Sequence, residues 1–178
     1  MLGFLRRSPH ARAATSLYAA AVAAARAPAF YATLGVPDTL DGRFDLVGLH
    51  AFLLIRRLQH ATPPGPELAQ AVFDAMFRDM DHNLREIGVG DLAVKHKMKQ
   101  MWEAFHGRAA AYEAALASAE VEALPAALAR NVWRAAPAPH AAVLARATRA
   151  QAAHLAAQPL AAFLAGTAMF LPIEAALR

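Results

Sequence analysis

The chain has 178 residues, enough for one domain with a sizeable core, and 57% of its residues are hydrophobic. It contains no cysteine, which excludes disulfides, thiolate metal sites and a cysteine nucleophile. The net charge is +4, and eleven of the 14 acids lie between Asp38 and Glu113, so both ends of the chain are basic. Basic ends favour anionic partners such as lipid head groups or ribosomal RNA, and ordinary solvated arginine faces are the alternative interpretation.

The chain begins with a basic, alanine-rich segment that has no acid before Asp38. Because alanine is the strongest helix former, residues 9–27 are predicted to form a helix that ends near Pro28. A cleaved signal peptide is the alternative, although alanine makes its apolar region weak. Residues 30–44 are rich in glycine, proline and aspartate, which predicts an ordered loop, and Asp45 is expected to cap the next helix through its carboxylate.

Three longer helices are predicted from apolar residues that recur at helical spacing. The first covers residues 45–61, and the second covers residues 66–87, with Pro66 in its first turn. The third covers residues 94–118 and carries a regular apolar stripe. Gly88 is expected to end the second helix in a left-handed conformation, and Asp91 is expected to cap the third.

Prolines divide the C-terminal part of the chain into shorter alanine-rich segments. Helices are predicted around residues 124–133, 140–157 and 160–171. Residues 159–173 form the longest uncharged apolar run, but a spanning helix needs roughly 20 such residues. The run therefore predicts a buried helix, with contact to a membrane surface as the alternative.

The chain shows no convincing strand pattern, so the predicted fold is all-α: a single-domain bundle of about six to seven helices. Residues 1–29 would form a basic N-terminal helix, and residues 30–118 would form the core of the fold. Residues 119–178 would contribute alanine-rich helices that pack on this core.

The sequence contains no recognisable catalytic motif. None of its serines lies in a Gly-x-Ser-x-Gly sequence, and the GVGD sequence at residues 88–91 follows a helix and is too short for a phosphate-binding loop. We therefore expect a binding or assembly protein that is not an enzyme and needs no cofactor.

Two alternative functions rest on individual side chains. Glu103 and His106 have the Glu-x-x-His spacing of di-iron helical bundles, and Asp79 with His82 is a second, imperfect pair. A metal-dependent helical-bundle enzyme is therefore one alternative, although these histidines can also pair with neighbouring acids at a helix surface. A haem- or quinone-handling protein is the other, because His50 lies in the middle of a predicted helix beside apolar residues.

The second and third long helices carry most of the methionines and several aromatic residues on their apolar stripes. Flexible thioether and aromatic side chains suit a groove for varied apolar clients, and core filling is the alternative. The candidate client-binding residues are Phe73, Met76, Phe77, Met80, Met98, Met101, Trp102 and Phe105. A nearby basic cluster is a candidate contact for an acidic partner or a phosphate backbone, and consists of Lys95, Lys97 and Lys99.

A series of short motifs follows in a fixed order between residues 30 and 116. They are Tyr31 with GVPDT at 35–39, DGRF at 41–44, LH at 49–50, RRL at 56–58, FDAMF at 73–77, DMD at 79–81, LREIGVGD at 84–91, KMK at 97–99, and EAFHGR at 103–108 with Tyr112. In order and spacing the series resembles the ubiquinol–cytochrome c chaperone family. His106 stands where this family is expected to have an aromatic residue such as tyrosine, which makes it a poor guide to a metal site.

The resemblance implies a non-enzymatic assembly factor for cytochrome b of the ubiquinol–cytochrome c reductase (bc1) complex. It implies newly made cytochrome b as client. Mitochondrial members of the family act near the ribosome with a small partner subunit, which makes both of these candidate partners without implying them for a bacterial member, and the basic ends add an anionic membrane surface as a further candidate. The alanine and arginine bias favours a bacterial member, cytoplasmic and peripheral to the inner membrane. Motif residues expected to have structural roles are Asp38, Arg43, Asp79, Arg85, Glu86, Asp91, Gly107, Arg108 and Tyr112.

Overall fold

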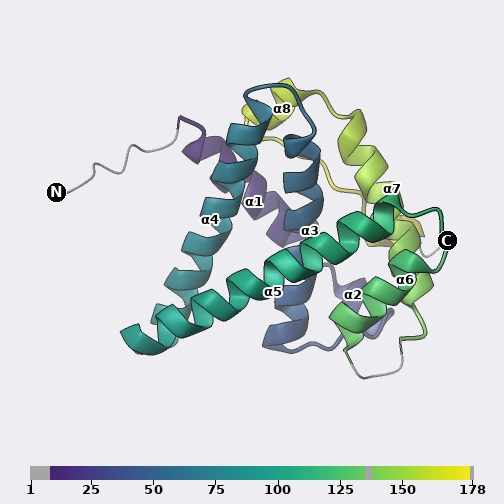
Figure 1. Ribbon diagram of the computed structural model, residues 1–178, viewed down its shortest axis with the longest axis horizontal. Coiled ribbons are helices and arrows are strands. Elements are labelled where there is room, and N and C mark those ends of the chain that lie inside the picture. The colour runs from purple at the N-terminus through teal and green to yellow at the C-terminus, as the bar shows by residue number, and fades with distance from the viewer. Residues whose placement is uncertain (1–8, 135–137, 177–178) are drawn as a thin grey trace.

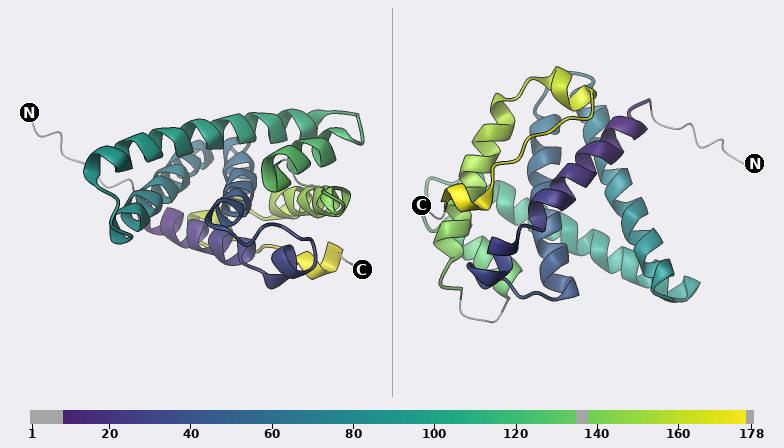
Figure 2. Two further views of the ribbon diagram at one scale, coloured as in Figure 1. Left: turned by 90° about the horizontal axis from the view of Figure 1, so that it is seen from below. Right: turned by 180° about the vertical axis from the view of Figure 1, so that it is seen from behind.

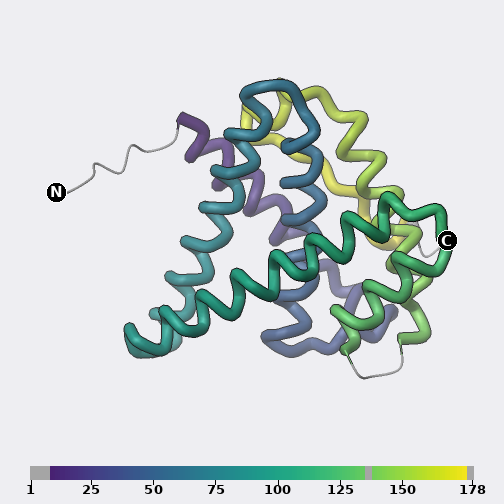
Figure 3. The backbone as a smooth tube through the Cα atoms, viewed as in Figure 1, coloured from purple at the N-terminus to yellow at the C-terminus, as the bar shows by residue number. Residues whose placement is uncertain are grey.

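The computed structural model describes residues 9–134 and 138–176. Arg6, Arg7 and Pro137, which contribute to the predictions for the two ends of the chain, lie outside these residues. Within them every regular element is helical, which confirms the all-α prediction (Figures 1 and 3). The elements are α1 (Ala11–Ala25), α2 (Pro28–Ala32), α3 (Leu40–Gln59), α4 (Gly65–Glu86), α5 (Asp91–Ala117), α6 (Ala123–Leu128), the π-helical turn η1 (Ala129–Trp133), α7 (Ala141–Ala157), α8 (Leu160–Leu164) and the 3-10 turn η2 (Ile173–Ala176).

Helix α3 lies at the centre of the fold, with α1 and α4 packed along it and α7 on its other side. Its leucines after Leu40 are buried, and Leu46, Leu54 and Leu58 have no exposed area, which explains why the helix takes this position. The long helix α5 crosses over α3 and α4 as a separate layer, and α1 lies on the opposite face (Figure 2). Among the described residues, the first half of α5 has a neighbouring helix on one side only, namely α4.

The start of α3 differs from the prediction. The helix begins at Leu40, inside the segment predicted as a loop, and Thr39 caps it by accepting a hydrogen bond from the Gly42 amide over 3.1 Å. A Cβ atom on Gly42 would stand 2.0 Å from the carbonyl oxygen of Pro37, so only glycine lets the chain return this closely to the first turn. Asp45 is therefore a residue of the helix interior, and the prediction that it is the cap is wrong.

The chain reverses sharply between α4 and α5. Gly88 has a φ of +83°, and its amide and that of Val89 donate to the carbonyls of Arg85 and Leu84, each over 3.0 Å. This geometry confirms the predicted left-handed stop. The prediction for Asp91 is wrong, because Gly90 is the N-cap of α5 and Asp91 is its first helical residue, where its charge still favours the helix dipole.

The C-terminal prediction also needs correction. Helix α8 ends at Leu164, and the chain then turns at Gly166, with a φ of +82°, into residues 167–172, which have no helical structure. We call residues 165–173 the C-terminal segment; it runs back along the molecule beside α3 (Figure 2). The side chains of Gln151 in α7 and of Gln158, which caps the end of α7, bind the backbone of this segment and so replace some of the helical hydrogen bonds. Among the described residues, no helix combines the length and the apolarity needed to cross a membrane.

Candidate functional site

A buried charge cluster holds α5 against α3. Asp45, whose side chain has no exposed area, contacts Arg108 of α5 at 2.8 Å and Arg134 at 3.2 Å. Arg134 also contacts Asp41 at 3.0 Å, and its φ of +60° lies in a region that residues other than glycine rarely adopt. Burial raises the pKa of Asp45 above its ordinary value, and the two arginines act in the opposite direction. The cluster fixes where α5 crosses the core.

Two further contacts support the same crossing. Arg56 of α3 donates to the carboxylate of Glu113 on α5 over 2.7 Å. Tyr112 is buried, and its ring lies 5.7 Å from that of Phe52, centroid to centroid. Burial raises the pKa of the Tyr112 hydroxyl. These contacts hold the second half of α5 in place, and the first half of the helix lies beside α4.

An aromatic cluster fills the angle between α4 and α5. Phe73 lies 4.6 Å from Phe77 on α4 and 5.7 Å from Phe105 on α5, measured between ring centroids. The ring of Trp102 stacks on that of His106 at 3.9 Å, and the Nδ1 atom of His106 donates to the Trp102 carbonyl over 2.9 Å. The indole ring continues the cluster to the surface, because Trp102 is 48% exposed.

The structure divides the eight candidate client-binding residues by burial. Met76, Met80 and Phe105 are buried in the core, so they do not form part of an exposed surface in this conformation. The other five are accessible from the side of α4 and α5. We call them the α4–α5 aromatic face: Phe73, Phe77, Met98, Met101 and Trp102.

The corner between α4 and α5 carries apolar residues that face solvent. Ile87 is 68% exposed and Leu92 is 85% exposed. The three lysines of the basic cluster, at positions 95, 97 and 99, are exposed on the first turns of α5 that follow. Figure 1 shows this corner at one edge of the molecule, away from α7 and α8. Apolar and cationic side chains therefore lie next to each other at a protruding point.

Arg85 stabilises this corner from the end of α4. Its guanidinium contacts Asp81 at 2.7 Å and also binds Asp91 at the start of α5. Hydrogen bonds from Arg85 lower the pKa of Asp81. Glu86 pairs with His82 at 3.1 Å one helical turn away.

The remaining motif residues lie in other parts of the fold. Arg43 pairs with Asp38 over 2.6 Å at the exposed start of α3. Asp79 accepts a hydrogen bond over 3.1 Å from the hydroxyl of Tyr18 on α1. Burial raises the pKa of the Tyr18 hydroxyl. This bond lies in an open groove of about 660 Å³ between α1 and α4. Gly107 has free space where a Cβ atom would stand.

The residues of the suggested metal site are engaged elsewhere. Glu103 lies 3.8 Å from Lys99, His106 bonds the Trp102 carbonyl, and Asp79 and His82 have the partners given above. Among the described residues, no group of three or more histidine, aspartate or glutamate side chains could hold a metal ion. The sequence supplies no positive argument for such a site beyond the spacing of two pairs.

Sequence reasoning missed two features of the site. It did not assign a role to Arg134, because nothing local links a residue of a short C-terminal helix to α3. It also missed the exposure of Leu92, for which a signal exists. The apolar stripe of α5 begins at Val94, and Leu92 falls on the opposite side of the helix at 100° per residue.

Known proteins resemble the chain in sequence and in fold. The pattern of the family described as ubiquinol-cytochrome C chaperone matches residues 32–170. The ubiquinol-cytochrome-c reductase complex assembly factor 1 of Xenopus laevis is 25% identical over 103 residues, which are 58% of this chain and 51% of that protein. The match therefore spans about half the length of this curated relative. The crystal structure of the Cbp3 homolog from Brucella abortus is similar with a TM-score of 0.82 and 38% identity over 96% of both chains. Because the family pattern matches well over half of its length, the chain belongs to the ubiquinol–cytochrome c chaperone family.

Proposed function

We propose that this protein is a non-enzymatic chaperone for the assembly of the ubiquinol–cytochrome c reductase (bc1) complex, with newly made cytochrome b as its client. Family membership supports the general role, and so does the name of the Xenopus relative, an assembly factor of that complex. We choose the α4–α5 aromatic face as the client surface because its apolar side chains are accessible. An apolar surface of this kind suits membrane segments that have not yet reached the bilayer.

The composition of this face supports a binding role. Phe73 and Phe77 are half-buried, so part of each ring is available to a partner while the rest is anchored in the core. Methionine side chains adapt to different apolar shapes, and tryptophan is enriched among residues that dominate binding energy. Burial of apolar area is worth about 25 cal/mol per Å², so a few hundred Å² would give several kcal/mol before the costs of association.

The protruding corner supports a location at the cytoplasmic surface of the inner membrane. Exposed Ile87 and Leu92 can enter the interfacial region of a bilayer, and the neighbouring lysines can bind anionic head groups. RNA at a ribosome would bind the lysines but would gain nothing from the two aliphatic side chains. The pairing of both kinds of residue therefore favours the membrane.

The test is capture of cytochrome b by Trp102→Asp in a strain that lacks the wild-type gene. The variant places a charge in the α4–α5 aromatic face at an exposed position, so the fold is expected to survive. Val121→Asp is the matched control, because Val121 is also an exposed apolar residue and lies beyond the far end of α5. We expect Trp102→Asp to lose co-purification of cytochrome b and to lower reductase activity in membranes, while Val121→Asp keeps both.

Two other outcomes would contradict the proposal at different levels. If folded Trp102→Asp, checked by circular dichroism, captures as much cytochrome b as the wild type, the α4–α5 aromatic face is not the client surface. If deletion of the gene leaves cytochrome b levels and reductase activity unchanged, the assembly role itself is wrong.

A further inference from the structure

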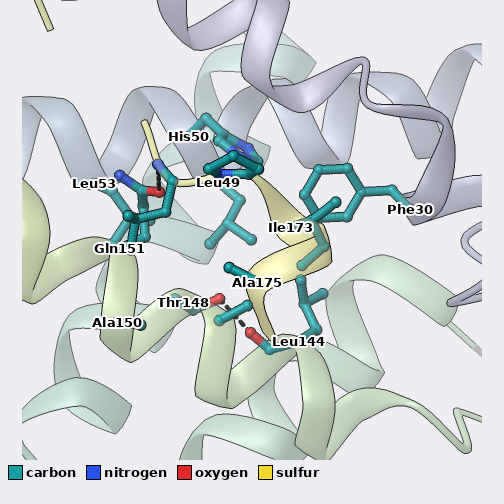
Figure 4. Close-up of a pocket in the computed structure, with 13 residues that line it drawn as sticks. Phe30, Leu49, His50, Leu53, Leu144, Thr148, Ala150, Gln151, Ile173 and Ala175 are labelled. Carbon is teal, nitrogen blue, oxygen red and sulfur yellow. Dashed lines mark hydrogen bonds between the residues drawn. The ribbon is translucent and has the colours of Figure 1, made fainter. Parts of the chain in front are cut away.

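A small cavity lies between α3, α7 and the C-terminal segment, on the other side of α3 from the α4–α5 aromatic face. Its volume is about 100 Å³, and its apolar walls include Phe30, Leu49, Leu144 and Ile173 (Figure 4). Among the described residues that line it, none carries an acidic side chain, a lysine or an arginine. A charged ligand would be buried without a partner, so the cavity suits an uncharged one.

Gln151 supplies a hydrogen-bond donor to this cavity. The residue is buried and lines the cavity from α7, and its Oε1 atom accepts a hydrogen bond over 2.7 Å from the amide of Leu171. Because only the oxygen can accept from an amide, this bond fixes the orientation of the side-chain amide. The Nε2 atom is buried and has no partner among the described residues. A buried donor without a partner is unfavourable, so a ligand that accepts a hydrogen bond from it gains affinity.

His50 supplies an acceptor from α3. Its Nδ1 atom is 2.8 Å from the carbonyl oxygen of Leu46, so Nδ1 carries the proton of the neutral ring. The Nε2 atom then has a free lone pair, and the described residues give it no hydrogen bond. Burial lowers the pKa of His50 from 6.5 to about 4, which keeps the ring neutral at physiological pH. Phe30 packs edge-on against the ring with centroids 5.5 Å apart and holds it in place.

The C-terminal segment closes the cavity on one side. Gln151 binds its Leu171 amide, and Gln158 binds the amide and the carbonyl of Met169 over 2.9 and 2.8 Å. Gln158 does not line the cavity, whereas Gln151 does. The two glutamines therefore share the role of holding the segment, and only one of them faces the cavity.

We propose that this cavity binds a small uncharged apolar molecule through a hydroxyl group, which donates a hydrogen bond to His50 and accepts one from Gln151. A hydroxyl is both donor and acceptor, which matches the two unpaired atoms. A closed cavity of about 150 Å³ holds benzene. The cavity here has about 100 Å³ and is partly open, so it encloses part of a six-membered ring and the rest of the ring lies at the opening. The site goes beyond the proposed chaperone function and does not depend on it.

The test uses isothermal titration calorimetry of the full chain with phenol, and with toluene, which has a methyl group in place of the hydroxyl. We expect saturable binding of phenol and about tenfold weaker binding of toluene, because toluene leaves both polar atoms unpaired. Gln151→Met and His50→Leu should each weaken phenol binding about tenfold. Ala147→Leu, which fills the cavity from α7, should abolish it.

Gln158→Met is the matched control, since it loosens the same segment without changing the cavity wall; we expect phenol affinity close to that of the wild type. If phenol does not bind the wild type, the cavity holds water only and the proposal is wrong. Equal affinity for toluene and phenol, or an equal loss in Gln158→Met and Gln151→Met, would also overturn it.

Discussion

Arg108 on α5 forms an ion pair with Asp45 on α3 over 2.8 Å, and the aspartate side chain has no exposed area. Loss of one partner of a buried pair leaves the other charge uncompensated, which typically costs about 3 kcal/mol or more. We therefore expect Arg108→Met to lower the free energy of unfolding by about 3 kcal/mol in urea titrations. Arg134→Met should cost less because Arg134 is half-exposed. A larger loss of unfolding free energy in Arg134→Met than in Arg108→Met would contradict this prediction. Arg43→Met, which breaks an exposed ion pair, is the control and should leave the free energy of unfolding unchanged.

Stability should also depend on pH through His50. Burial lowers its pKa in the folded state from 6.5 to about 4, so between these values the unfolded chain binds a proton that the folded chain excludes. The free energy of unfolding should therefore fall as pH drops from 6.5 towards 4, by on the order of 2 kcal/mol at pH 5. His50→Gln should flatten this part of the profile, measured by urea unfolding at several pH values. The exposed His60→Gln should keep the wild-type profile; if it flattens the profile equally, His50 is not the cause.

The methionines of α4 and α5 should have separate effects on stability and on client binding. Met76 is fully buried, so Met76→Ala is expected to cost about 3 kcal/mol of unfolding free energy by opening a cavity. Met98 is half-buried, so Met98→Ala should cost clearly less but should reduce capture of cytochrome b. Urea titrations and co-purification, performed on both variants, measure the two effects. If Met98→Ala destabilises the fold as much as Met76→Ala, Met98 belongs to the core and not to a binding surface.

The basic cluster should govern attachment to anionic membranes. A lysine near such a surface contributes about 1 kcal/mol, so the triple variant of Lys95, Lys97 and Lys99 to Gln should bind anionic vesicles much more weakly at low salt. A second triple variant, Arg12, Arg26 and Arg130 to Gln, removes three exposed cations from other parts of the fold and should keep most of the binding. Vesicle sedimentation measures both. Strong binding to ribosomal RNA with none to vesicles would support the ribosome as partner in place of the membrane.

Much of the fold could be predicted from the sequence because its signals are local. The apolar periodicity of α4 and α5 depends on neighbouring turns of one helix, and the left-handed stop at Gly88 depends on one residue without a side chain. The candidate client residues were harder to sort. Met76 and Met98 share the same kind of stripe, and only the packing of other helices decides which of them is enclosed.

The sequence by itself determined the all-α fold class, the sharp corner between α4 and α5, and the motif series that indicates the family. Tertiary structure alone decided the role of Asp45, because the arginines that bind its carboxylate come from distant parts of the chain and outweigh its local capping tendency. It also decided the path of the C-terminal segment. Gln151 and Gln158 bind the backbone of this segment and so provide hydrogen bonds that a helix would otherwise make within itself. The sequence of the segment alone does not indicate that these glutamines are its partners.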